Sequence, residues 1–118
     1  MGDLSPHFSR HEFRCKCGCG LDTVDVETIE LCEVVREIVG ASVTVVSGHR
    51  CATHNAKVGG GRKSQHLHGR AADLAVKDPR AVYGELCRRY PDTYGFGVYP
   101  SHGFVHVDSR TNAARWEG

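Results

Sequence analysis

Hydrophobic side chains recur along residues 25–39 at the three- and four-residue intervals that place them on one face of a helix. Asp25 precedes this stretch and suits a helix N-terminus, while Gly40 follows it and suits a helix C-terminus. We therefore predict the main helix over residues 25–39. Its apolar face consists of Val26, Leu31, Val34, Val35 and Ile38.

Four shorter stretches have the composition of strands. Val43–Val46 is β-branched, and Ala71–Val76 is rich in small and branched side chains. Gly95–Tyr99 and Phe104–Asp108 predict two more strands, which the polar, glycine-containing segment Pro100–Gly103 joins in a hairpin turn.

Three further helices are indicated by their ends. Ser9–Glu12 has the pattern of a capping box that opens a short helix. A short helix is also expected over Ala52–Lys57, and Asp78 with Pro79 starts a longer one that ends near Tyr90. Together these elements predict a single domain over residues 1–118. Its fold class is α+β, with helices packed on a small, mostly antiparallel sheet.

Overall charge and hydropathy narrow the classes of function. The formal net charge of the 118-residue chain is +1, which gives no electrostatic reason to expect nucleic acid or an anionic membrane as a partner. The N-terminus lacks the pattern of a secretory signal, and no apolar stretch has the roughly 18 residues of a membrane span. We therefore expect synthesis in the cytoplasm without a signal peptide.

Candidate metal ligands are concentrated in two segments. Eight histidines are many for so short a chain, and histidine is the commonest metal ligand in proteins. The densest segment contains His66, in a loop, and Asp73, in the strand that follows. A third ligand is available from the strand 104–108, where alternation places His106 and Asp108 on one face and two valines on the other. Three protein ligands with one position left open are typical of a catalytic zinc site.

The same residues carry a resemblance to a known family. The pattern Ser64-x-His66-x-x-Gly69-x-Ala71-x-Asp73, followed by His106 between two valines, resembles zinc D-alanyl-D-alanine carboxypeptidases and endolysin-type peptidases, which share their fold with the hedgehog signalling domain. The resemblance extends to the segment 47–50, SGHR, where the family usually has Ser-Gly-Tyr-Arg. The opening segment 4–13 and the Cys-x-Cys-Gly segment after it resemble a compact subgroup common in phages and prophages.

The resemblance implies a site, an activity and a partner. His66, Asp73 and His106 would bind Zn²⁺, and Arg50 would hold the substrate carbonyl or terminal carboxylate and stabilise the oxyanion. Ser64 and Gln65 would orient a ligand or bind substrate. The implied reaction is hydrolysis of a peptide bond in peptidoglycan: D-Ala–D-Ala, a D,D cross-link or L-Ala–D-Glu. The expected partner is the peptidoglycan stem peptide, and the expected state is a monomer that acts in the periplasm or cell wall after release through a partner's membrane pore.

One departure from the family concerns the general base. Many relatives carry a catalytic carboxylate three residues before the last histidine, and this chain has Gly103 there. The remaining candidates are His102, Asp108 and His68, of which Asp108 could equally pair with Arg50. We favour His102 because a neutral imidazole near pH 7 suits proton transfer.

The six cysteines divide into two sets. Cys32 and Cys87 fall in predicted helices and are expected to be small buried side chains. The other four could form a second, structural metal site or a disulfide, or stay free thiols as expected in a reducing cytoplasm. Their spacing differs from the Cys-x2-Cys pairs of four-cysteine zinc sites. These four are Cys15, Cys17, Cys19 and Cys51.

Two other readings of the whole chain stay open. If Gly103 marks lost catalysis, the domain would be a zinc-containing module that only recognises wall peptides or a protein partner. A phage structural component at a tail tip is the third possibility. We expect His7, His11, His49 and His54 to be surface or packing residues, and Gly59–Gly61 to be the edge of a flexible loop.

Overall fold

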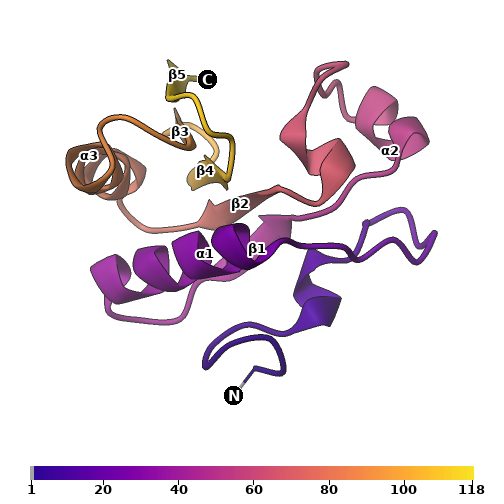
Figure 1. Cartoon of the computed structure of the whole chain (residues 1–118), viewed down its shortest axis with the longest axis horizontal. Helices are drawn as coiled ribbons and strands as arrows, with labels where there is room; N and C mark the ends of the chain where they lie inside the picture. The colour runs from indigo at the N-terminus through magenta and orange to yellow at the C-terminus, as the bar shows by residue number, and fades with distance from the viewer. Residues whose placement is uncertain (1) are drawn as a thin grey trace.

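The computed structural model describes residues 2–118 and confirms the α+β class (Figure 1). Its sheet has five strands in the order β1-β2-β4-β3-β5. All neighbouring pairs are antiparallel except β3 with β5, which is parallel. The strands are β1 (Thr44–Ser47), β2 (Ala71–Ala75), β3 (Gly95–Tyr99), β4 (Phe104–Asp108) and β5 (Ala114–Glu117).

The two long helices, α1 (Val26–Val39) and α3 (Pro79–Arg89), contact each other and cover one face of the sheet. Both begin at the predicted caps, because Asp25 accepts a hydrogen bond from the Thr28 amide and Asp78 accepts one from the Ala81 amide. The shorter elements are a 3₁₀ turn η1 (Arg10–Phe13), the helix α2 (Ala52–Lys57) and a 3₁₀ turn η2 (Gln65–His68). No helix among residues 2–118 is long and apolar enough to cross a lipid bilayer.

The core lies between the two long helices and the sheet. Alternate residues of the central strands face it: Leu74 lies opposite Val105, and Ala72 lies opposite Val107. The core also includes Phe8 and Phe13 from the N-terminal segment, Leu31, Cys32 and Val35 from α1, Val82 and Leu86 from α3, Val45 and Phe96.

Most predicted elements are confirmed within a residue or two, and three details differ. Val26 is 69% exposed, so the apolar face of α1 begins at Leu31 rather than at the first turn. His66 lies in η2 rather than in an irregular loop. Strand β5 was not predicted, because its short sequence, ARWE, lacks an apolar alternation.

The opposite face of the sheet carries the polar side chains. Asp73 on β2 lies directly opposite His106 on β4, so both point away from the core that their neighbours fill. An irregularity in β1 between Val45 and Ser47 sets Ser47 opposite Asp73. The sheet thus brings residues from three strands to one place.

Candidate metal centre

His66, Asp73 and His106 converge on one point on the polar face of the sheet. One donor atom from each lies within 4.8 Å of the others, and all three residues are buried. His66 Nε2 lies 3.3 Å from Asp73 Oδ2, and His106 Nδ1 lies 3.0 Å from Asp73 Oδ1. Ligands at about 2.0–2.1 Å from a tetrahedral zinc ion are about 3.3 Å apart, which is close to the separation of each imidazole nitrogen from an Asp73 oxygen, so the cluster is compact enough to hold the metal.

Each imidazole is oriented by a second partner. His66 Nδ1 lies 2.7 Å from the Gly48 carbonyl oxygen, and His106 Nε2 lies 2.7 Å from Asp108 Oδ2. Because both oxygens only accept hydrogen bonds, these nitrogens carry the protons. The other nitrogen of each ring faces Asp73, and it is the nitrogen that would bind a metal once any proton on it has been released.

The electrostatics of the cluster favour a cation. Burial by itself raises the pKa of Asp73, but contacts with His106 and His66 outweigh it and hold that pKa well below its ordinary value. Burial would lower the pKa of His106, yet hydrogen bonds to Asp108 and Asp73 raise it. Asp73 is thus ionised, and its carboxylate stabilises positive charge beside it, whether a ring proton carries that charge or a metal ion that replaces the proton.

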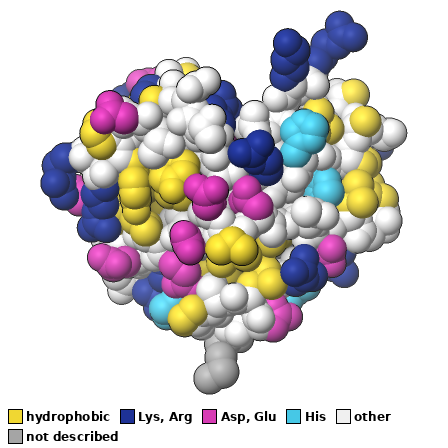
Figure 2. Space-filling model, in the orientation of Figure 1, with side chains coloured by type: hydrophobic (Ala, Val, Ile, Leu, Met, Phe, Trp, Pro, Cys, Tyr) yellow, Lys and Arg dark blue, Asp and Glu magenta, His cyan; other side chains and the backbone are white. Residues whose placement is uncertain are grey.

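A cavity of about 410 Å³ opens beside the three donors. Arg50, Ser64 and Gln65 line it, together with three aromatic side chains, Tyr99, Phe104 and Trp116. Figure 2 shows a notch in the upper edge of the molecule, with basic and histidine side chains beside it, between the part that holds β3 to β5 and the part that holds α2. The predicted loop edge Gly59–Gly61 also lines this cavity.

Arg50 is held at the wall of the cavity by three side chains. Its guanidinium donates to Asp73 Oδ2 at 3.3 Å, to Ser47 Oγ at 3.1 Å and to Asn55 Oδ1 at 3.3 Å. The ion pair is with Asp73, so Arg50 does not pair with Asp108. A fixed positive charge therefore lies next to one of the candidate ligands.

Two polar groups near η2 fulfil different roles. Ser64 caps this turn, accepting a hydrogen bond from the His66 amide at 3.2 Å, and so positions a candidate ligand. Gln65 Oε1 is buried and has no hydrogen-bond partner among the described residues. An acceptor left without a partner beside a cavity is suited to a donor from a bound molecule.

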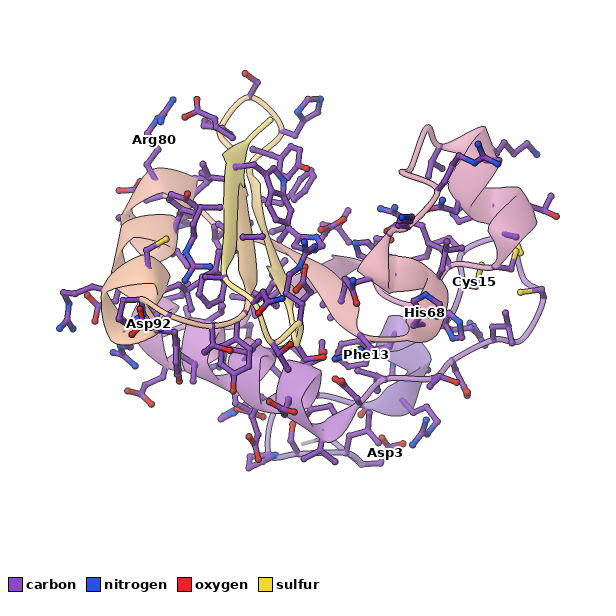
Figure 3. The ribbon with its side chains drawn as sticks, turned by 45° about the horizontal axis from the view of Figure 1, so that its top comes forward. Asp3, Phe13, Cys15, His68, Arg80 and Asp92 are labelled. Atoms are coloured by element: carbon purple, nitrogen blue, oxygen red, sulfur yellow. The ribbon has the colours of Figure 1, made fainter. Side chains whose placement is uncertain are left out.

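The three candidates for the general base all lie outside the lining of the cavity, as far as residues 2–118 show. Asp108 is fully buried between His106 and Arg110. The Arg110 guanidinium donates hydrogen bonds to both carboxylate oxygens of Asp108, at 2.7 and 2.8 Å. His102 is exposed on the turn between β3 and β4, with its ring centre 6.2 Å from that of Phe104. His68 is exposed on η2 (Figure 3).

The hydrogen bonds of Asp108 lower its pKa despite its burial, as those of Asp73 do. Burial raises the pKa of the Asp108 carboxyl, but the hydrogen bonds from His106 and Arg110 outweigh it and hold the pKa well below its ordinary value. A carboxylate this firmly ionised and this fully bonded orients His106 and is a poor proton acceptor.

Sequence reasoning missed the contribution of the C-terminal segment to the site. Trp116 on β5 lies with its indole ring 4.8 Å from the His106 ring, and its Nε1 donates to the Tyr99 hydroxyl at 2.8 Å. A Cβ at Gly97 would lie 2.4 Å from Trp116 Nε1, so this strand position must be glycine to admit the indole. The G-x-G pattern of β3 was the available signal.

The remaining histidines include one packing residue. His49, which stands where the resemblance expects tyrosine, is buried, and its Nδ1 accepts from the Thr23 amide at 3.1 Å. His7 is exposed and lies 2.7 Å from Glu33. Neither belongs to a cluster of potential metal ligands in the described part of the chain.

Comparison with known proteins gives a family match. A family model described as Peptidase M15 matches residues 6–108. The matched range contains the three candidate ligands, Arg50, and the residues that orient both histidines. No curated protein matches the chain.

Proposed function

Because the chain belongs to the peptidase M15 family, we propose that it is a zinc metallopeptidase that hydrolyses peptide bonds in bacterial peptidoglycan. The observation that carries the proposal is the convergence of His66, Asp73 and His106 beside a cavity, with both imidazoles oriented by a second partner. Three donors leave a coordination position for water or substrate, as in other catalytic zinc sites.

The bound zinc ion would polarise the scissile carbonyl and lower the pKa of a bound water to about 7. Arg50 would stabilise the negative charge that develops on the carbonyl oxygen, because its guanidinium is fixed at the cavity wall by three hydrogen bonds. Gln65 would accept a hydrogen bond from a peptide N–H, since its buried Oε1 has no other partner in the described chain. Asp108 would hold the His106 ring in place.

For the general base we propose His102. Its exposed ring lies 6.2 Å from that of Phe104, which lines the cavity, and this role requires a change of side-chain rotamer that brings the ring to the attacking water. The buried hydrogen bonds of Asp108 to His106 and Arg110 argue against Asp108 in this role. His102→Ala should lower kcat about 100-fold or more with bound zinc unchanged, whereas an unchanged kcat would remove His102 from the mechanism.

The composition of the cavity favours a peptide with a free carboxylate near the cut. Arg50 and Arg110 both line it, and Tyr99, Phe104 and Trp116 supply flat apolar surfaces. Muropeptide stems carry such carboxylates, and the D-Ala–D-Ala and L-Ala–D-Glu bonds both lie close to one. We propose stem peptides of this kind as the substrate, bound by a monomer acting in the periplasm or cell wall.

Digestion of purified peptidoglycan tests the proposal. Protein treated with a chelator should release no peptides, and zinc should restore release, with mass spectrometry of the products identifying the bond. Arg50→Ala should bind zinc and lose turnover, while Arg88→Ala, an exposed arginine on α3, should behave as wild type. Zinc-loaded protein that releases nothing from peptidoglycan would contradict the proposal.

One observation favours a second candidate function. Among the described residues that line the cavity, Asp73, His66 and His106 are the only acids or histidines, so no proton acceptor remains once they bind metal. The domain would then be a zinc-containing module that binds wall peptides without cleaving them. Retention on insoluble peptidoglycan without any released product would support this function over hydrolysis.

A further inference from the structure

Four cysteines from two distant segments meet on the side of the molecule away from α3. Cys15, Cys17 and Cys19 follow η1, and Cys51 lies directly before α2. One sulfur from each lies within 4.8 Å of the others. Figure 3 shows these sulfur atoms between the N-terminal loop and α2, next to the labelled Cys15. The remaining cysteines, Cys32 and Cys87, lie in α1 and α3.

The separations between the sulfur atoms match a shared metal ion better than a disulfide. Cys17 Sγ lies 3.5 Å from Cys15 Sγ and 3.6 Å from Cys51 Sγ. Zinc–sulfur bonds of about 2.3 Å place the corners of a tetrahedron about 3.8 Å apart. A disulfide needs about 2.05 Å, and all six cysteines are free thiols.

The backbone of the loop explains how a Cys-x-Cys-x-Cys segment can surround one ion. In an extended strand, alternate residues would lie about 6.8 Å apart, so their side chains would be poorly placed to bind one metal ion together. Here the chain turns instead: Cys15 N–H donates to the Leu21 carbonyl at 2.7 Å, and Gly18 N–H donates to the Cys15 carbonyl at 3.2 Å. Gly18 and Gly20 have φ of 86° and 92°, which other residues rarely adopt.

The surroundings of the sulfurs suit thiolates. The Cys51 amide donates to Cys15 Sγ and the His54 amide donates to Cys51 Sγ, each at 3.4 Å. Such N–H groups stabilise metal-bound thiolates. Four thiolates around Zn²⁺ carry a net charge of −2, and the basic residues Arg14 and Lys16 line a hollow that adjoins Cys15.

We propose that Cys15, Cys17, Cys19 and Cys51 bind a second, structural Zn²⁺ ion. Four protein donors close the coordination sphere, so this ion has no position for substrate. It clamps the N-terminal segment to the start of α2, and Cys51 adjoins Arg50 in sequence. The ion therefore fixes the backbone from which Arg50 reaches the cavity. This inference is independent of the proposed peptidase activity.

The metal content of purified protein tests this inference. The full chain is prepared under reducing conditions without chelator, and zinc per chain is measured by mass spectrometry of the metal. We expect two zinc ions in wild type, one in the His66→Ala/His106→Ala variant and one in the Cys17→Ser/Cys19→Ser variant. Cys87→Ser, which changes a cysteine on α3 away from the cluster, is the matched control and should keep both.

A second measurement covers the case in which the cysteine variant fails to fold. Cobalt(II) bound to the His66→Ala/His106→Ala protein should show the near-ultraviolet charge-transfer absorption of thiolate ligands. No zinc in the His66→Ala/His106→Ala protein, a cobalt spectrum without thiolate absorption, or an intact mass two hydrogens lower, as a disulfide would give, would each overturn the proposal. Bound iron in place of zinc would overturn the choice of metal. Loss of peptidoglycan hydrolysis alone leaves the cysteine-bound zinc in place, so the two proposals fail separately.

Discussion

The His–Asp–His cluster and the four-cysteine cluster differ in what holds them in place. The first has two of its three members on paired strands, is buried, and has its imidazoles fixed by Gly48 and Asp108. The second lies mainly in an irregular loop, and Cys17 and Cys19 are exposed. The fold therefore preorganises the first site, whereas in our proposal the ion bound at the second site holds the loop around it in place. A site with three protein donors leaves a coordination position for catalysis, whereas four protein donors fill the coordination sphere, as in structural zinc sites.

The largest expected effect is that of His106→Ala, which should empty one metal site and leave the other occupied. His106→Ala should abolish zinc binding at the first site and all measurable hydrolysis, because only two donors remain. Zinc at the cysteines should stay, and a metal assay together with a peptidoglycan assay checks both statements. His54→Ala, a half-buried histidine on α2, is the control and should keep activity. Full zinc content in the His106→Ala protein would disprove this ligand set.

Arg50→Ala should produce the next largest effect. Loss of the guanidinium that stabilises the oxyanion should lower kcat by about 100- to 1000-fold while zinc remains bound. Steady-state kinetics on a released muropeptide with a parallel metal assay measure both. If kcat stays within a few-fold of wild type, Arg50 serves only as the structural partner of Asp73.

Asp108→Asn distinguishes a positioning role from a proton-transfer role. The variant weakens the hold on the His106 ring, so zinc affinity should fall about 10- to 100-fold. Competition with a chelator of known affinity measures the change. At saturating zinc the variant should recover most of its kcat. A kcat reduced 100-fold with zinc affinity unchanged would instead make Asp108 the general base.

The smallest expected effect is a local change in amide hydrogen exchange after both metals are removed, and it compares the two sites directly. Amides in the loop 15–21 should exchange hydrogen about tenfold faster or more, because few regular hydrogen bonds hold this loop. The amides of Asp73 and His106, in the centre of the sheet, should keep their protection. Equal changes in both regions would contradict the difference between a preorganised and a metal-organised site.

The sequence predicts most of the fold because the ends of its elements are strongly marked. Asp25 with Gly40, and Asp78 with Pro79, identify both long helices almost to the residue. Strand β5 is not predicted because its side chains show no apolar alternation, and its parallel pairing with the edge of β3 is a tertiary contact that the local sequence does not reveal. The exposure of Val26 likewise depends on how α1 is rotated on the sheet.

Some parts of the candidate sites could be predicted from the sequence and others could not. Strand alternation was enough to put His106 and Asp108 on one face. The Asp108 contact with Arg110 was not predictable, since it depends on Gly95 opposite: a Cβ there would lie 2.3 Å from Asp108 Oδ2. The sequence does not predict that the four cysteines meet, because their spacing does not reveal how the loop after η1 turns toward Cys51.

Everything proposed for the reaction requires that His66, Asp73 and His106 hold a zinc ion with one coordination position free for water or substrate. Anomalous diffraction at the zinc absorption edge, from crystals of the zinc-loaded protein, tests it most directly. We expect an anomalous peak within bonding distance of all three side chains, with no fourth protein atom bound. A peak elsewhere, or a fourth protein ligand on the ion, would contradict it.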